Sequence, residues 1–146
     1  MSRTALVLSA LVSLALLGQA EAADTAKIVQ PDAFTWQPAQ GLPPGAEMTV
    51  LYGDPSKEGP FALRFKFPAG YEIATHSHST AEFITVLSGK GQMTFGEKAD
   101  RATAEPLPAG AFMTLPAGAW HHLWIDEATI VELHSTGPFD VHMATQ

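Results

Sequence analysis

Short runs of β-branched and aromatic residues recur along most of this chain, separated by turns that contain glycine and proline. The runs cover residues 47–52, 61–67, 83–87, 92–95, 112–115, 121–126 and 129–134. Turn sequences bound them, for example Gly-Asp-Pro at 53–55 and Pro-Ala-Gly at 116–118. Downstream of the N-terminal segment, no window repeats its apolar residues with helical spacing. The pattern predicts an all-β domain, either a sandwich or a small barrel.

Side-chain alternation within the runs predicts strands that bury one face only. In one run, Leu63, Phe65 and Phe67 share one side, whereas Arg64 and Lys66 share the other. This is the two-residue period of a β-strand that lies beside a core. At 146 residues, the chain has room for one such core.

The N-terminus has the order of a secretory signal peptide. Arg3 precedes an almost wholly apolar stretch at 5–18, and an Ala-Glu-Ala sequence at 20–22 supplies a small-residue cleavage site. The apolar stretch is shorter than the roughly 18 residues that a membrane-spanning helix needs. We therefore predict a signal peptide over residues 1–22, and a periplasmic or secreted protein that has no membrane contact after cleavage.

The rest of the chain divides into an arm and a body. Residues 23–45 are polar and irregular, and we expect Phe34 and Trp36 to hold this arm against the body. Residues 46–146 contain all the predicted strands and form the barrel domain.

Composition argues against several kinds of partner. The net charge is −7 and no basic cluster occurs, so we expect no nucleic acid and no anionic membrane surface among the partners. The chain has no cysteine, and therefore neither disulfides nor thiolate metal ligands. We expect the partner to be a small-molecule ligand or substrate.

The densest group of metal-ligand residues lies at 76–82. His76 and His78 are two residues apart and point to the same face of a strand, and Glu82 can return to them after a tight turn. His121 is a fourth candidate, far downstream. Three imidazole nitrogens and one carboxylate suit Fe, Mn, Zn, Cu or Ni better than Ca²⁺ or Mg²⁺. We predict one divalent transition metal bound by these four side chains.

This group fills the first signature of the cupin superfamily. Gly70 precedes His76 by five intervening residues, three residues separate His78 from Glu82, and six separate Glu82 from Gly89. Every specified position of that signature is present, so the chain resembles a small single-domain cupin.

The second cupin signature follows in the right order. Gly110, Pro116, Gly118 and His121 fill it, but Ile125 stands where the family has asparagine. The departure removes no metal ligand and makes the predicted floor of the barrel more apolar. The resemblance implies a small jelly-roll barrel of two antiparallel sheets. It also implies a homodimer, since small cupins commonly dimerise.

A metal held by four protein ligands in octahedral geometry keeps two positions open for water or substrate, as catalytic sites do. Histidines must be neutral to bind a metal, and their ordinary pKa is about 6.5. From the sequence, we therefore expect metal affinity to fall between about pH 7 and pH 5.

Two further residues are candidates for acid–base catalysis, Glu132 and His134. They share a strand face with Ile130, while Val131 and Leu133 share the other face. If the first face points into the barrel, both polar groups lie beside the metal. If it points outward, they are surface groups, and the sequence leaves both arrangements open.

The remaining polar and aromatic candidates favour the outside of the barrel. His122 points opposite to His121 and is expected at the outer surface or an interface. Trp120 and Trp124 lie on the same side as His122, where they cover the outer face or form a dimer interface. His142 lies near the end of the chain and has no predicted role.

Two classes of function fit these predictions. The first is a metalloenzyme acting on a small molecule, an oxidoreductase of the dioxygenase kind, with cupin isomerase and lyase chemistry open at the same site. The second is a module that binds or senses a metal or ligand without turnover. A structural metal in a storage-type protein fits less well, because the chain is small and carries the features of an exported protein.

Overall fold

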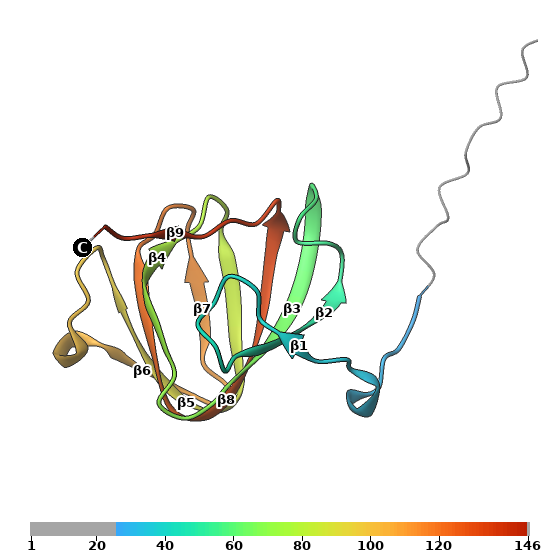
Figure 1. The fold of residues 1–146 in the computed structure, drawn as a ribbon, viewed down its shortest axis with the longest axis horizontal. Coiled ribbons are helices and arrows are strands. Elements are labelled where there is room, and N and C mark those ends of the chain that lie inside the picture. Colours follow the sequence, from blue (N-terminus) through green and yellow to red (C-terminus); the bar gives the residue numbers. More distant parts are fainter. Residues whose placement is uncertain (1–25, 146) are drawn as a thin grey trace, which may run out of the picture.

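Antiparallel strands make up almost all the regular structure of the computed structural model, which describes residues 26–145 (Figure 1). The predicted signal peptide at 1–22 lies outside the described residues. The elements, in chain order, are η1 (Pro31–Ala33), β1 (Gln37–Pro38), β2 (Glu47–Tyr52), β3 (Gly59–Phe67), β4 (Glu72–Ser77), β5 (Glu82–Phe95), η2 (Arg101–Thr103), β6 (Glu105–Pro108), β7 (Phe112–Leu115), β8 (His121–Gly137) and β9 (His142–Met143).

The long strands β5 and β8 each run through two sheets. The C-terminal half of β8 pairs with β3 and with the N-terminal half of β5, giving the order β1-β2-β3-β8-β5-β7. The N-terminal half of β8 pairs with β4 and with the C-terminal half of β5, giving the order β9-β4-β8-β5-β6. Every pairing is antiparallel. The predicted jelly roll is confirmed, with its two sheets continuous through the shared strands.

β5 bends where the sequence predicted a turn. The expected strands at 83–87 and 92–95 are the two halves of β5, and the glycine-containing segment between them carries three register shifts against β8. Gly89 has a φ of +81°, and a Cβ there would collide with the carbonyl oxygen of Ala128 on β8. Glycine therefore lets the two backbones meet at the bend. The expected strands at 121–126 and 129–134 are likewise the two halves of β8.

Four strands fall outside the predicted runs, namely β1 in the arm and three strands of the body. β4 is rich in polar residues, and its pairing with β8 shifts register between Ile73 and His76. β6 contains Pro106 and Pro108 and pairs with β5 alone, as expected of a proline-containing strand at a sheet edge. β9 has only two residues. The short helix η2 lies between β5 and β6.

The arm contacts the body as predicted. The Lys66 ammonium lies 3.8 Å from the centre of the Trp36 ring, and the Arg64 guanidinium lies 5.0 Å from that of Phe34. Both cations belong to the outward face of β3, so the aromatic rings of the arm cover that face. The stretch is not wholly irregular, because β1 pairs with β2.

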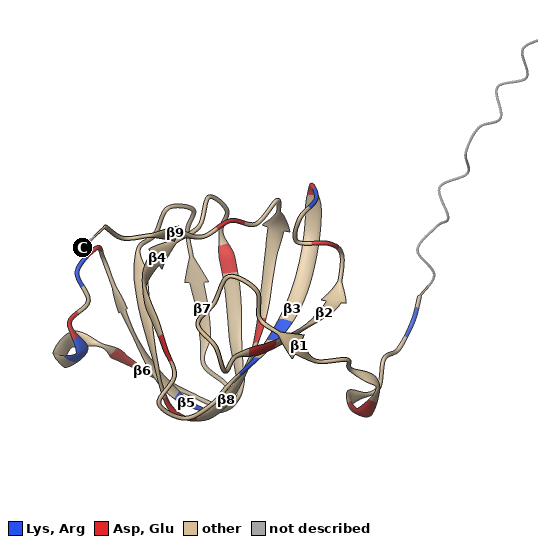
Figure 2. Cartoon of the chain, in the orientation of Figure 1, with Lys and Arg blue, Asp and Glu red and all other residues tan. Residues whose placement is uncertain are grey.

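Apolar side chains from both sheets meet in the barrel interior. The buried members include Leu63, Phe67, Ile84, Val86, Ile125, Val131 and Leu133. Lysine and arginine residues are dispersed along the described chain (Figure 2). Within residues 26–145, no helix is long and apolar enough to cross a membrane.

Candidate metal centre

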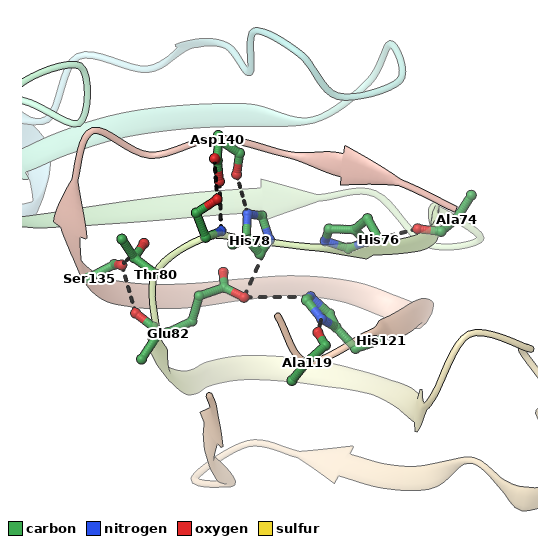
Figure 3. Close-up of polar contacts among 11 residues, drawn as sticks. Ala74, His76, His78, Thr80, Glu82, Ala119, His121, Ser135 and Asp140 are labelled. Carbon is green, nitrogen blue, oxygen red and sulfur yellow. Dashed lines mark hydrogen bonds and ion pairs between the residues drawn. The ribbon is translucent and has the colours of Figure 1, made fainter. Parts of the chain in front are cut away.

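The bends in β5 and β8 bring the predicted ligands together. Because each strand folds back on itself, both of its ends lie at the same end of the barrel (Figure 1). Glu82 is the first residue of β5 and His121 the first of β8. His76 lies on β4, paired with His121, and His78 follows just beyond. All four side chains are buried and converge in Figure 3.

Backbone carbonyl groups fix the orientation of each imidazole. Nδ1 lies 2.8 Å from the Ala74 oxygen in His76 and 3.0 Å from the Ala119 oxygen in His121. In His78, Nδ1 lies 2.5 Å from the carbonyl oxygen of Asp140. A carbonyl oxygen only accepts, so each Nδ1 carries the proton and donates. Each neutral ring therefore keeps its Nε2 lone pair for a metal.

Glu82 faces two of these lone pairs. Its Oε2 lies 3.3 Å from Nε2 of His78 and 3.6 Å from Nε2 of His121. That oxygen is buried without a hydrogen-bond partner. The ligand atoms of the three histidines lie within 4.8 Å of one another. Two atoms bound about 2.1 Å from one ion are roughly 3 to 3.5 Å apart, so the Glu82 distances fit a shared metal.

Burial sets the charge state of this cluster. Desolvation, together with the neighbouring His121, lowers the pKa of His76 to about 3. Desolvation lowers the pKa of His121 to about 4, and also lowers that of His78. Burial raises the pKa of Glu82 to about 8. His76 and His121 are therefore neutral well below pH 6, and the expected loss of metal affinity between pH 7 and pH 5 does not come from these two residues.

Three residues that the sequence did not single out hold the ligand-bearing loop. Ser135 Oγ on β8 donates to the Ala81 carbonyl oxygen at 2.7 Å, beside Glu82. The Asp140 carboxylate accepts from the backbone N–H and the hydroxyl of Ser79, at 2.7 and 2.6 Å. The ring of Phe139 stacks on that of His78, with centroids 4.4 Å apart. No spacing rule in the sequence links these residues to the ligands.

A cavity of about 420 Å³ opens beside the four ligands. Apolar side chains from both sheets form most of its wall, including Leu63, Ile84, Val131 and Leu133. Ile125, at the position of the signature asparagine, is 2% exposed and also lines it. The predicted apolar floor is therefore present.

Glu132 and His134 lie outside the barrel. Their strand neighbours Val131 and Leu133 line the cavity, so alternation turns the two polar side chains outward. Glu132 accepts from Nε of Arg64 at 2.7 Å and pairs with Nε2 of His134 at 2.9 Å. Burial raises the pKa of Glu132, but these two partners outweigh it and lower the pKa. The arrangement that made the pair acid–base candidates is therefore absent.

His122 points away from His121, as predicted, but it is buried. Its Nδ1 bonds to Thr75 Oγ1 at 3.1 Å and its Nε2 to Glu72 at 2.8 Å, which ties β8 to β4. Its ring stacks on that of Trp124 at 4.1 Å. Trp124 and Trp120 are both half-buried within the chain, so they give no reason for a partner. The homodimer stays a prediction.

A jelly roll that buries three histidines able to hold a metal ion defines a cupin barrel. The chain belongs to the ChrR cupin-like domain family, whose model matches residues 24–140. The sequence matches none of the curated proteins.

Solved structures share the fold at low sequence identity. The polyketide cyclase RemF from Streptomyces resistomycificus aligns with a TM-score of 0.71 at 14% identity, over 84% of this chain and 87% of its own. A putative acetylacetone dioxygenase from Methylibium petroleiphilum PM1 aligns at 0.64 with 23% identity, over 80% of each chain. KdgF from a Halomonas species aligns at 0.60 with 18% identity, over 77% of this chain and 96% of its own.

Proposed function

We propose that this protein is an exported metalloenzyme that oxidises a small molecule with O₂. One divalent transition metal would be held by His76, His78, Glu82 and His121. The observation that carries the proposal is the buried Glu82 Oε2, which has no hydrogen-bond partner and faces imidazole nitrogens whose lone pairs are free. A cation satisfies all these atoms together.

A bound redox-active ion such as Fe(II) supplies Lewis acidity and electron transfer to O₂ at its open coordination positions. The chain supplies the surroundings. Backbone carbonyls hold the three imidazoles with Nε2 directed inward, and Glu82 contributes the negative charge. The apolar cavity wall excludes water from a bound substrate.

The cavity wall favours oxidation over isomerase or lyase chemistry. Among the described residues that line it, Glu82 is the only acid and the three ligand histidines are the only imidazoles. No lining side chain outside the ligand set can move a proton at neutral pH. The fold shared with a putative acetylacetone dioxygenase agrees with metal-centred oxidation. A cavity wall without acid–base groups also suits the second candidate, a cupin that binds or senses a ligand without turnover.

Export belongs to the same proposal and depends on the predicted signal peptide at 1–22. An exported chain that folds outside the cytosol meets a different metal supply. Affinity rises through Fe(II) and Ni(II) to Cu(II), with Zn(II) also tight. Protein recovered from the periplasm is therefore expected to carry mainly Zn(II) or Cu(II), and elemental analysis against a cytosolic version without residues 1–22 checks this.

The test of turnover is oxygen uptake by protein reconstituted with Fe(II), Mn(II), Cu(II), Ni(II) or Zn(II). The substrates are a panel of phenols, thiols and β-diketones, and the His76→Ala/His121→Ala protein is the control. We expect uptake that depends on substrate and is lost in the double variant. Metal bound at one equivalent without turnover on any metal would contradict the enzyme and favour the binding module.

A further inference from the structure

The cavity beside the ligands is built for an uncharged guest. Of all the described side chains that line it, Glu82 is the only aspartate, glutamate, lysine or arginine, and its carboxyl group belongs to the proposed metal centre. The nearest cations on β3, Arg64 and Lys66, point outward to the rings of the arm. An anionic guest would therefore find no cationic side chain inside, and in the metal-free protein it would lose its water without gaining a partner. A cationic guest would face the positive charge of the metal.

Apart from the proposed metal ligands, four polar side chains line the cavity: Gln37, Gln40, Thr49 and Thr129. Thr129 lines the interior, but its hydroxyl already bonds to backbone atoms of Lys90 and Glu127. Gln37 and Gln40 of the arm also line the cavity, and both are exposed. Val50, another lining residue, is 47% exposed. Most of the exposed lining residues therefore lie where the arm and β2 meet, and the two glutamines are among them.

We propose that the cavity takes an uncharged, mainly hydrocarbon molecule that enters past Gln37 and Gln40. About 420 Å³ lies at the small end of the range for ligand pockets, roughly 300 to 1,000 Å³, which limits the guest to a compact molecule such as a compound of one to three rings. Its hydrocarbon part contacts the walls, and a neutral oxygen or amide group meets the glutamine amides. That the guest is also a substrate of the metal rests on the proposed function; the class of guest rests on the cavity alone.

Two fluorescent probes with one skeleton test this class: neutral N-phenylnaphthylamine and anionic anilinonaphthalene sulfonate. In the metal-free protein, we expect the neutral probe to bind with one equivalent per chain and the sulfonate at least about tenfold more weakly, because its charge finds no cationic side chain inside. Equal or tighter binding of the sulfonate would overturn the proposal. The titration measures binding rather than turnover, and it is run on both metal-loaded and metal-free protein. Its outcome is therefore independent of any failure of the proposed oxidation.

Three single-residue variants test where on the protein the probe binds. Gln40→Arg puts a cation at the entrance, and Gln30→Arg puts the same cation on the arm away from the cavity. The preference is the dissociation constant of the sulfonate divided by that of the neutral probe. We expect only Gln40→Arg to lower this ratio, by about tenfold. Phe112→Ser removes the aromatic side chain most exposed on the outer surface, at 62%, and should leave binding unchanged. Loss of binding in Phe112→Ser, or equal effects of the two arginines, would overturn the location.

Discussion

The state of single side chains decides what the candidate metal centre does at each pH. Each ligand histidine donates its Nδ1 proton to a backbone carbonyl, and burial lowers its pKa. Glu82 is perturbed in the opposite sense, because burial raises its pKa to about 8. In metal-free protein at neutral pH the cluster is therefore largely uncharged, and a metal must displace the Glu82 proton to use the carboxylate.

Metal affinity is predicted to depend on pH through Glu82. Below about pH 8, binding releases one proton, so affinity should fall by about tenfold for each unit of pH. Protonation of His121 and His76 adds to the loss only near pH 4 and pH 3. Glu82→Gln carries no such proton, and titrations with Zn(II) from pH 5 to pH 8 should give a nearly flat affinity. A slope unchanged in Glu82→Gln would show that another group releases the proton.

At this scale the sequence predicted which residues come together at the candidate centre, but not their electrostatics. The spacing of His76, His78 and Glu82 is enough to bring them together on a strand and its turn. The orientation of Glu132 and His134 depended instead on which face of one strand met the core. Period-two alternation leaves that choice open until the partner strands are known. The pKa shifts depend on burial by distant segments, which no local pattern reports.

At the scale of elements, two glycines of the first cupin signature, Gly70 and Gly89, are expected to differ in how much the fold depends on them. Gly70 and Gly89 both have positive φ, +79° and +81°. A Cβ on Gly70 meets open space, whereas one on Gly89 collides with the backbone of β8. Gly70→Ala should cost about 1 kcal/mol of unfolding free energy from backbone conformation. Gly89→Ala should cost several times more or prevent folding. Urea unfolding measures both, and equal losses would contradict a tight crossing of β5 and β8.

The segment after β8 positions a metal ligand without binding metal. Phe139 stacks on His78, and the Asp140 carbonyl accepts from its Nδ1. Phe139→Ala should free the His78 ring and weaken metal affinity by about tenfold or more, as losses around metal ligands do. Phe112→Ala, which removes an aromatic ring from the outer surface, is the matched control. Competition titration with a chelator measures the metal affinity of each variant. Identical affinities in the two variants would contradict the proposal that the segment after β8 positions His78.

The elements themselves were predictable where apolar alternation marked them. β2 and β7 coincide with their expected runs at 47–52 and 112–115. β4 was not among the runs, because its buried positions include histidine and threonine, which serve the metal centre and the bond to His122. The halves of β5 and β8 were expected as separate strands, since a glycine-containing bend and a turn share one composition.

At the scale of the whole molecule, the candidate metal centre brings together side chains from both sheets at one end of the barrel. Glu82 lies on β5 in one sheet, and His76 lies on β4 in the other. A metal bound only by the native state should therefore stabilise the whole fold. At a free metal concentration about 100 times the dissociation constant, the gain is about 2.7 kcal/mol. For a domain of this size, that raises the midpoint of thermal unfolding by roughly 5 to 10 °C. Unchanged midpoints with metal and with a chelator would argue against a native-state site.

The central claim is that His76, His78, Glu82 and His121 bind one transition metal ion. The most direct test is elemental analysis after reconstitution with one metal and gel filtration. Wild type is compared with His76→Ala/His121→Ala and with Glu132→Gln/His134→Ala, a pair on the outer face. The account predicts one equivalent in wild type and in the outer-face variant, and less than about one tenth of an equivalent in the ligand variant. Full occupancy in the ligand variant, with both proteins folded, would contradict the account.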